Sequence, residues 1–476
     1  MSFAKIYTRG LLGLHAPQIE VEVHISSGLP SLTIVGLPEA AVRESKDRVR
    51  SAIINSGFLF PTKRLTINLA PADLPKDGSR LDLPIALGIL IASGQLPENC
   101  TDGFEFIGEL ALDGHLRPVS GTLTIAMACQ QARHRLLLPT ANLDEASQLP
   151  EFEVYAASHL QQVCAHFLGN SPLKAAPQKS MAASSRYPFD LADVKGQLRP
   201  RRALEIAAAG GHSLLFKGPP GTGKTLLASR LPSILPPLNA QENLEVASIY
   251  SVANAQHTFG QRPFRAPHHT ASAIALVGGG SQPKPGEITL AHLGVLFLDE
   301  LPEFDRKVLE VLRQPLESKE IVISRAARQM TFPANFQFIA AMNPCPCGYA
   351  FNQDSRCQCS PESIQRYQNR ISGPLLDRID LHIDVPPLQA NELQERTPSE
   401  NSETVRQRVM KAYQQQIQRQ QCLNQALSPT LLEQYACLDD SSSKIIEMAQ
   451  QRLNLSARAY HRVLRVARTI ADLAES

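Results

Sequence analysis

The sequence predicts an α/β protein in which an α+β domain precedes a parallel-sheet core and a helical segment follows that core. Three observations lead to this class. A glycine-rich loop follows a short apolar run, two further apolar runs end in polar residues, and β-rich runs alternate with helical stretches at the start of the chain. A chain of 476 residues is too long for one ordinary core, so we expect two or three domains.

The composition is that of a globular protein, with 43% hydrophobic and 19% charged residues. A formal net charge of +2 excludes a global basic field, so any contact with nucleic acid must be local. The first residues lack the long apolar core of a signal peptide, and no window reaches 18 consecutive apolar residues. We therefore expect a cytoplasmic protein that does not span or bind a membrane.

The first domain is expected over residues 1–168, where β-rich runs alternate with amphipathic stretches. The expected strands are Ile19–Ile25, Ser31–Val35, Arg64–Leu69 and Leu136–Pro139, and the expected helices are Ala40–Ser56, Leu83–Ser93 and Thr122–Ala132. Residues 169–189 are small, polar and proline-containing without an apolar period, which predicts a linker.

A strand expected over Ser213–Phe216 leads directly into the glycine-rich segment GPPGTGKT. In a loop of this kind, backbone N–H groups turn inward around a β-phosphate, Lys224 reaches the β and γ oxygens, and the Thr225 hydroxyl ligates Mg²⁺. The residues of this loop are Gly218, Pro219, Pro220, Gly221, Thr222, Gly223, Lys224 and Thr225. The pattern predicts a site for ATP or another nucleoside triphosphate.

A second apolar strand, Val295–Leu298, ends in Asp299 and Glu300. A strand buried on both faces of a parallel sheet would deliver Asp299 to the Mg²⁺ site. The adjacent Glu300 would polarise the water that attacks the γ-phosphate. The distance in sequence from the glycine-rich loop makes this pair a strong partner motif.

A third strand, expected over residues 336–341, leads to Asn343. Its amide would hold the attacking water near the γ-phosphate, although a plain turn residue before Pro344 is the alternative. Because the carboxyl ends of parallel strands meet at one edge of a sheet, we expect Asn343 to lie beside Lys224 and Asp299.

Four of the nine cysteines form two closely spaced CxC pairs, Cys345 with Cys347 and Cys357 with Cys359. Four thiolates at this spacing can make a tetrahedral Zn²⁺ site, and a loop of reduced cysteines without metal is the alternative. The remaining cysteines are expected to be packing residues, namely Cys100, Cys129, Cys164, Cys422 and Cys437.

The ordered segments GPPGTGKT, VLFLDE and IAAMNP resemble those of AAA+ ATPases, which assemble as rings with ATP at the subunit boundary. The longer segments RPFRAPHHTASAIALVGGG, NPCPCGY and RISGPLLDRIDLHIDV resemble the magnesium-chelatase-like ComM/YifB family over essentially the whole chain. The resemblance implies an AAA+ core over residues 190–388 and a helical lid over 389–476.

The same resemblance implies a homo-hexameric, ATP-driven helicase that acts on single-stranded, double-stranded and branched DNA. Its expected role is branch migration while incoming single-stranded DNA recombines during natural transformation. The alternative is the ATPase motor subunit of a magnesium-chelatase-type complex.

The resemblance implies functions at the ATP site for two arginines. Arg378, in LLDRID, corresponds to the finger inserted into a neighbour's ATP site, and an ion pair with Asp377 or Asp380 is the alternative. Arg458 matches the sensor-2 arginine, which would reach the γ-phosphate from the lid. Three further arginines of this segment are expected to form a solvated or DNA-facing surface, namely Arg462, Arg465 and Arg468.

Residues 320–332 read as two short strands with Arg325 and Arg328 near the turn. In related ring ATPases a hairpin here enters the central pore, where the two arginines would bind DNA phosphates, and an ordinary solvated hairpin is the alternative. His268 and His269 are expected to shape a loop, because no third metal ligand accompanies them.

The segments GLPSLTIVGLPEAAVRESKDRV and PKDGSRLDLPIALGILIASGQLP resemble the Lon-protease-type domain, of the ribosomal S5 domain 2-like fold. Arg80 stands at the position of the serine nucleophile, with Ser79 one place early, and the window 123–125 lacks the lysine base. We therefore expect no peptidase activity. The remaining basic residues are expected to be an exposed DNA-contacting or ring-stabilising surface, or charges without a function, namely Lys63, Arg64, Lys76 and Arg80.

Overall fold

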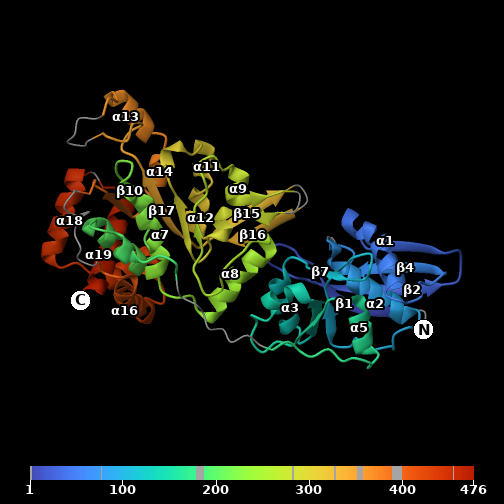
Figure 1. Cartoon of the computed structure of the whole chain (residues 1–476). Helices are drawn as coiled ribbons and strands as arrows, with labels where there is room; N and C mark the ends of the chain where they lie inside the picture. The colour runs from blue at the N-terminus through green and yellow to red at the C-terminus, as the bar shows by residue number, and fades with distance from the viewer. Residues whose placement is uncertain are drawn as a thin grey trace. The chain divides into compact units, whose positions relative to one another are not determined.

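The computed structural model of the chain divides into two compact units (Figure 1). The first comprises Met1–Ala182 with Ala247–His257, and the second comprises Ala183–Val246 with Thr258–Ser476. The residues that the structure describes are 3–74, 76, 78–177, 187–280, 283–325, 328–350, 357–388, 399–453 and 455–475.

The first unit is built on a seven-stranded mixed sheet with the order β3-β4-β2-β1-β5-β8-β9. Its strands are β1 (Phe3–Arg9), β2 (Gln18–Ser26), β3 (Ser31–Val35), β4 (Arg64–Ala70), β5 (Phe104–Phe106), β8 (Arg135–Pro139) and β9 (Val154–Ala157). Strand β2 pairs antiparallel with β1 and β4, whereas β3, β5, β8 and β9 join by parallel pairing. Alternate residues of β2 are buried, as expected for a sheet with one face on the core.

The helices of this unit are α1 (Ala40–Asn55), α2 (Asp82–Ala92), α3 (Thr122–Gln131), α4 (Leu143–Ala146) and α5 (Leu160–Phe167). A 3₁₀ turn, η1 (Ser79–Leu81), precedes α2, and a small hairpin joins β6 (Glu109–Leu110) to β7 (Leu116–Arg117). Every residue of α2 is buried, because this helix packs between α1 and strands β1 and β2. Its apolar composition on all sides is what such a central position requires.

A buried ion pair joins two neighbouring strands of this sheet. Arg9 of β1 donates to both carboxylate oxygens of Glu105 of β5, at 2.6 and 2.7 Å, and His134 lies 2.8 Å from the same carboxylate. The Glu105 side chain is fully buried. Burial raises its pKa, but the hydrogen bonds from Arg9 and His134 outweigh burial and hold the pKa below its ordinary value.

The second unit contains a five-stranded, all-parallel sheet with the order β11-β14-β17-β10-β18. Its strands are β10 (Leu214–Lys217), β11 (Phe264–Arg265), β14 (Val295–Leu298), β17 (Gln337–Met342) and β18 (Leu381–Asp384). All residues of β14 and β17 are buried, which explains their continuous apolar runs. Two separate hairpins pair β12 (Gly278–Gly279) with β13 (Lys284–Pro285), and β15 (Glu320–Arg325) with β16 (Arg328–Pro333).

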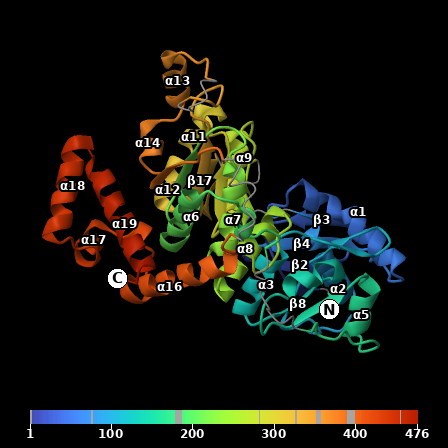
Figure 2. The same cartoon turned by 60° about the vertical axis from the view of Figure 1, so that its left-hand side comes forward.

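Helices α6 and α7 pack against this sheet (Figure 2). The helices of the core are α6 (Leu198–Gly210), α7 (Lys224–Ile234), α9 (Ala273–Val277), α10 (Glu287–Leu290), α11 (Arg306–Glu310), α12 (Arg313–Ser318), α13 (Pro361–Gln368) and α14 (Gly373–Leu376). Helix α8 (Ala240–Ala253) is divided between the two units after Val246. Shorter 3₁₀ turns are η3 (Leu191–Asp193) and η4 (Leu301–Glu303).

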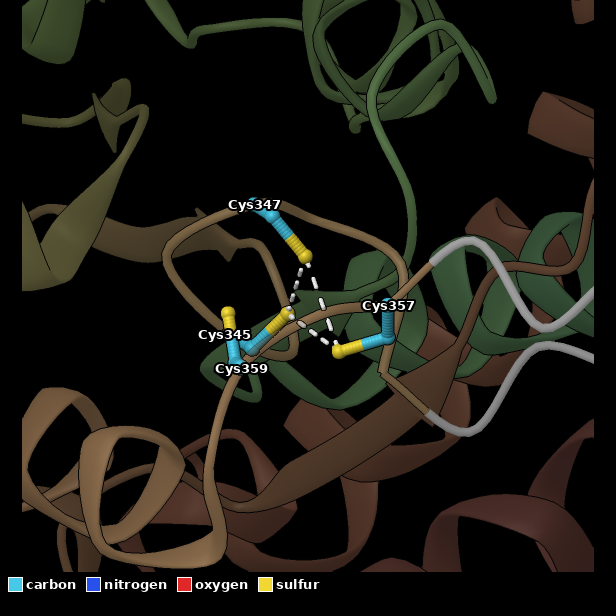
Figure 3. A group of neighbouring side chains, drawn as sticks. All are labelled: Cys345, Cys347, Cys357 and Cys359. Carbon is cyan, nitrogen blue, oxygen red and sulfur yellow. Dashed lines mark hydrogen bonds between the residues drawn. The ribbon is translucent and has the colours of Figure 1, made fainter.

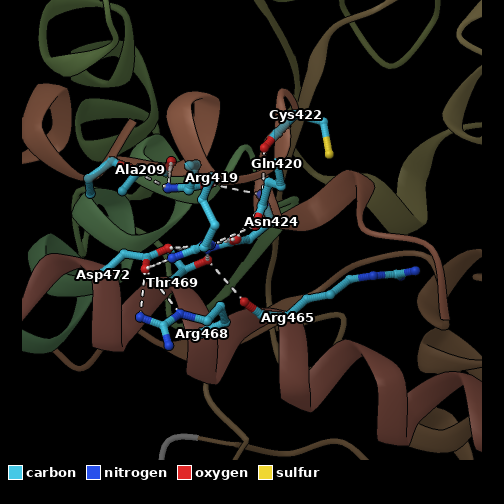
Figure 4. A network of polar contacts seen from close by, with 11 residues as sticks. Ala209, Arg419, Gln420, Cys422, Asn424, Arg465, Arg468, Thr469 and Asp472 are labelled. Atoms are coloured by element: carbon cyan, nitrogen blue, oxygen red, sulfur yellow. Dashed lines mark hydrogen bonds and ion pairs between the residues drawn. The ribbon is translucent and has the colours of Figure 1, made fainter. Parts of the chain in front are cut away.

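The C-terminal part is helical, with α16 (Ser402–Gln420), α17 (Pro429–Tyr435), α18 (Asp440–Leu453) and α19 (Ala457–Leu473). A polar network holds α16 and α19 together (Figure 4). Arg419 donates to both oxygens of Asp472, at 2.7 and 2.9 Å, and Asn424 donates to Asp472 and Thr469. The buried His212 lies 2.8 Å from the Thr469 hydroxyl, so the network also fastens the helical part to the end of α6.

The predicted elements are confirmed to within one or two residues at their ends. The fold class is, as predicted, α/β, with an N-terminal α+β domain, a parallel-sheet core and a helical C-terminus. Within the described part of the chain, no helix is long and apolar enough to cross a membrane. Nine residues of the predicted linker, 178–186, lie outside the described residues, so its boundaries stay a prediction.

Three expectations about single side chains are wrong. Lys76 is fully buried and donates to the carbonyl of Pro71, and Arg80 is 8% exposed, so neither belongs to an exposed basic surface. Both come from a segment that precedes the buried helix α2 and is drawn into the core with it. Cys437 is exposed, whereas the buried Cys129 and Cys164 do pack in the interior.

We expect Glu105→Ala to destabilise the first unit by about 3–5 kcal/mol, because Arg9 would keep a buried charge without a partner. Hydrogen exchange of the β1 and β5 amides in the full chain measures this change locally. Glu20→Ala is the matched control, since it removes the half-exposed Lys5–Glu20 pair of the same sheet and should cost at most about 1 kcal/mol. Equal protection in both variants would contradict the expectation.

Candidate nucleotide-binding site

Parallel pairing brings the carboxyl ends of three strands to one edge of the second unit's sheet. Lys217 of β10 lies opposite Met342 of β17, and Leu298 of β14 lies opposite Ala340 of β17. The glycine-rich loop, the Asp299-Glu300 pair and Asn343 follow these strand ends directly. The sequence prediction that these segments meet is therefore confirmed, and the meeting point is where ligands bind in open parallel sheets.

Lys224 is the first residue of α7 and is 7% exposed. Its ammonium donates to the carbonyls of Gly218 and Pro219, at 2.7 and 2.8 Å, and to Oδ1 of Asn343, at 3.0 Å. Burial lowers the pKa of Lys224, and the nearby carboxylates of Asp299 and Glu300 oppose that effect. The ammonium thus lies at the centre of the loop with acceptors that a phosphate can replace.

The shape of the loop depends on a close approach at its first glycine. A Cβ atom on Gly218 would lie 2.3 Å from the carbonyl oxygen of Val385, which follows β18. Gln197 also holds the loop, because its side-chain amide donates to the carbonyls of Thr222 and Pro386. Sequence reasoning missed Gln197, since nothing in its local pattern distinguishes it from an ordinary residue before a helix.

Oxygen ligands suited to a magnesium ion stand next to Lys224. The Thr225 hydroxyl donates to Oδ2 of Asp299 at 2.5 Å. A hydroxyl and a carboxylate beside a phosphate-binding loop fit the preference of Mg²⁺ for oxygen ligands. A Mg²⁺ ion held there would neutralise negative charge on the phosphate oxygens of a bound nucleotide. Thr225 and Asp299 are the residues that would hold it.

Glu300 adopts a left-handed backbone conformation, with φ of 52°, which is uncommon for a residue with a side chain and occurs often at functional sites. Its carboxylate lies 3.4 Å from Nδ1 of His269, and the His269 ring lies tilted against that of His268 with a centroid distance of 4.1 Å. Strand β11 precedes these histidines and is the neighbour of β14, which explains the contact. His269 was expected only to shape a loop, and only the strand order reveals its place beside Glu300.

Arg378 lies at the amino-terminal ends of the parallel strands, whereas the glycine-rich loop lies at their carboxyl ends. It precedes β18, and Leu381 of β18 pairs in parallel with Leu214, the first residue of β10. The loop follows the other end of β10, so a four-residue strand, about 13 Å long, separates the two positions along the strand direction. Within a single chain, Arg378 and the loop therefore belong to opposite edges.

The carboxylate partner of Arg378 is neither Asp377 nor Asp380 but Glu317, at 2.7 Å. Asp380 instead accepts hydrogen bonds from the backbone N–H and the hydroxyl of Ser213. The ion pair of Arg378 is thus with Glu317 of α12 and not with either of its two neighbours in sequence.

Arg458, at the start of α19, donates to the same oxygen of Glu317 at 2.5 Å. Four residues on, Arg462 donates to the carbonyl of Ile379 at 2.8 Å, so the start of α19 also lies at the Arg378 edge. Arg465 and Arg468 bind the carbonyl of Leu427 and the Asp472 carboxylate, respectively. Arg462 and Arg465 thus bind carbonyls outside α19, and Arg468 pairs with Asp472 of its own helix, so the three are not a freely solvated face. Their contact with DNA stays a prediction.

The predicted arginine hairpin is confirmed as a hairpin. Strands β15 and β16 pair antiparallel, and Arg325 lies opposite Arg328. Residues 326–327 and the side chains of both arginines lie outside the described residues. Their contact with DNA stays a prediction.

The four cysteines of the two CxC pairs converge on one point (Figure 3), with all four sulfur atoms within 4.8 Å of one another. The Sγ atom of Cys345 lies 3.3 Å from that of Cys347 and 3.8 Å from that of Cys357. Zn–S bonds of about 2.3 Å in a tetrahedron place the sulfur atoms about 3.8 Å apart, so the cluster fits a Zn²⁺ ion. The intervening residues 351–356 lie outside the described residues.

The cysteine loop packs directly on the glycine-rich loop. Gly348 lies so close to Pro220 that an added Cβ atom would be 2.6 Å from Pro220 Cδ. The loop also begins two residues after Asn343, which contacts Lys224. The cluster therefore supports the wall of the nucleotide site from outside.

The strand order and the residues at its carboxyl edge define a AAA+ ATPase core, which here follows a Lon-like α+β domain. Three family models match the chain: "Magnesium chelatase, subunit ChlI" over residues 190–393, "Subunit ChlI of Mg-chelatase" over 21–142, and "Magnesium chelatase, subunit ChlI C-terminal" over 399–476.

Several individual proteins are also similar in sequence to this chain. The chain is 50% identical to the uncharacterized protein YifB of Salmonella typhimurium and 50% identical to the competence protein ComM of Haemophilus influenzae. Each match covers 99% of this chain and 94% of the relative. A 27% match to Lon protease 2 of Bacillus subtilis covers 34% of this chain and 31% of that protein. The chain belongs to the magnesium-chelatase-like ComM/YifB family.

Proposed function

We propose that this protein is an ATP-driven DNA helicase of the AAA+ class, which promotes branch migration while incoming single-stranded DNA recombines during natural transformation. The proposed ATP hydrolysis is supported by the arrangement of charged groups around the sheet. Lys224, Thr225, Asp299 and Glu300 gather at one edge, whereas Arg378 belongs to the other edge. A chain of this kind completes its site only with a second copy.

The chemistry follows from the residues at the carboxyl edge. Lys224 exchanges its bonds to the loop carbonyls and Asn343 for bonds to the β- and γ-phosphate oxygens of ATP. Glu300 polarises the attacking water, and the amide of Asn343 orients it in line with the γ-phosphate. Closing the subunit boundary removes bulk water, so these dipoles act more strongly on the transferred phosphoryl group.

Arg378 supplies the remaining positive charge from a neighbouring subunit. A guanidinium inserted in trans neutralises the charge that develops on the γ-phosphoryl oxygens, which makes hydrolysis depend on assembly. Head-to-tail contacts between identical chains close into rings when the rotation permits. We propose a homo-hexamer.

The proposed action on DNA is supported by a similar protein and by the β15–β16 hairpin. A relative that matches along the full length is named for competence, and Arg325 of β15 pairs with Arg328 of β16. Around a ring, these positions would present Arg325 and Arg328 repeatedly to the phosphates of single-stranded, double-stranded or branched DNA. Such binding has no sequence preference and weakens with salt.

A second candidate is the ATPase motor of a magnesium-chelatase-type complex. It is favoured by one observation, the match of all three segments to models described by the chelatase subunit ChlI. A motor of that kind would be stimulated by its protein partners instead of by DNA.

We also propose that Cys345, Cys347, Cys357 and Cys359 bind one structural Zn²⁺ ion. The sulfur positions suit a closed tetrahedral site, and a site without an open position holds a loop in place without taking part in the reaction. Because this loop packs on Pro220, the ion would stiffen the wall of the nucleotide site.

With ATP, the purified protein should displace a labelled strand from forked and three-stranded DNA. Glu300→Gln should bind ATP and DNA but displace no strand, because it keeps the shape of the site and loses the group that polarises water. A gel assay of displaced strand, together with ATPase rates with and without DNA, measures both effects. Absent displacement combined with hydrolysis that DNA does not stimulate would contradict the helicase and favour the chelatase motor.

Elemental analysis should find about one zinc per chain. The double variant Cys347→Ser/Cys359→Ser should lose this zinc and bind a fluorescent ATP analogue more weakly, since the wall beside Pro220 would loosen. Cys437→Ser is the matched control, because Cys437 is exposed and outside the cluster. Equal zinc content in the double variant and the control would refute the assignment.

A further inference from the structure

Glu317, near the end of α12, joins two arginines from distant parts of the second unit. Its Oε1 atom accepts from Nη2 of Arg378 at 2.7 Å and from Nη2 of Arg458 at 2.5 Å. Arg378 comes from the turn before β18, and Arg458 comes from the first turn of α19. A single anionic oxygen therefore brings together the two arginines that sequence reasoning assigned to the γ-phosphate of ATP.

The two arginines are held differently by the rest of the fold. The Arg378 side chain is 11% exposed, its Nη1 donates to the carbonyl of Pro374, and its buried Nε has no hydrogen-bond partner among the described residues. Arg458 is 49% exposed. Arg378 is thus a largely buried, incompletely paired donor, and Arg458 is a half-exposed one that Glu317 pairs beside it.

An open depression leads to this point. It is lined by Glu310, Arg313, Gln314, Glu317, Ser318 and Arg378. The arginines hold the pKa of Glu317 below its ordinary value, chiefly through the hydrogen bond from Arg458. The side chain of Glu317 is 51% exposed, so solvent screens these ion pairs and an incoming anion can replace them.

Two guanidinium groups that donate to one oxygen can bind a phosphoryl group as well as a carboxylate. The terminal phosphate of ATP carries more charge than a carboxylate and has three oxygens to offer. The phosphate must come from a second copy, because the chain's own glycine-rich loop follows the opposite end of β10. The depression faces the solvent, where that second copy can approach.

We propose that Glu317 stands in for the γ-phosphate of the neighbouring subunit's nucleotide, holding Arg378 and Arg458 in the single chain and releasing both when that phosphate arrives. This inference rests on the proposed role of Arg378 in trans. Glu317 is then a positioning residue that competes with assembly. It keeps the two like charges together in the free chain and delays their use until a loaded neighbour is present.

The test is the dependence of ATPase turnover on protein concentration. Glu317→Gln keeps the shape of the side chain but not its charge, so the arginines lose their competing anion. The protein concentration that gives half-maximal ATPase turnover should fall by about two- to fivefold. A change of this size corresponds to the loss of one or two exposed ion pairs. Glu317→Asp should stay near the wild type, because it retains the charge.

Glu403→Gln is the matched control, since it removes a surface ion pair with Arg406 on α16 and should leave the half-maximal concentration unchanged. Sedimentation of each variant with a non-hydrolysable ATP analogue gives the assembly step without turnover. A merely structural role would raise the half-maximal concentration in Glu317→Gln, so an unchanged or higher value overturns the inference.

Arg378→Ala in the same assay separates this inference from the function on which it rests. Lost turnover in Arg378→Ala with an unshifted Glu317→Gln rejects only the role of Glu317. Full turnover in Arg378→Ala rejects the trans arginine itself, and the role of Glu317 with it.

Discussion

The parallel register of β10 and β18 is the constraint on which the rest of the site depends. It fixes the glycine-rich loop at the carboxyl edge of the sheet and Arg378 at the amino edge. Within one chain, the proposed catalytic arginine and the glycine-rich loop therefore lie at opposite ends of β10. Under the proposed function, assembly would then be a condition for hydrolysis.

The polar network around Asp472 extends the same constraint to the helical C-terminus. His212 follows α6 and contacts Thr469 of α19 at 2.8 Å, while its other ring nitrogen lies 3.5 Å from Asp380, next to β18. Burial raises the pKa of Asp380, but His212 and Ser213 outweigh it and keep the carboxylate charged. These contacts join α19 to the end of β18 that lies next to Arg378.

Much of the core was predictable because its motifs are local. The apolar run Val295–Leu298 becomes β14 with the same ends, and the parallel-sheet rule alone places Asp299 and Asn343 beside Lys224. The side-chain contacts that could not be predicted depend on partners distant in the sequence. Periodicity revealed the helix that carries Arg462, but not the Ile379 carbonyl that holds it. The contact of Glu317 with Arg378 joins segments whose proximity no local pattern encodes. Three-residue strands such as β5 are too short to show a period.

Mixing two inactive variants tests most directly the claim that each site is shared by two chains. Lys224→Ala removes the phosphate-binding lysine but keeps Arg378, and Arg378→Ala does the reverse. Each variant alone should be inactive, whereas an equal mixture should recover about a quarter of the wild-type turnover, because about one head-to-tail boundary in four then combines an intact loop with an intact arginine. A mixture as inactive as its components, measured where sedimentation shows that mixed assemblies form, would contradict the account.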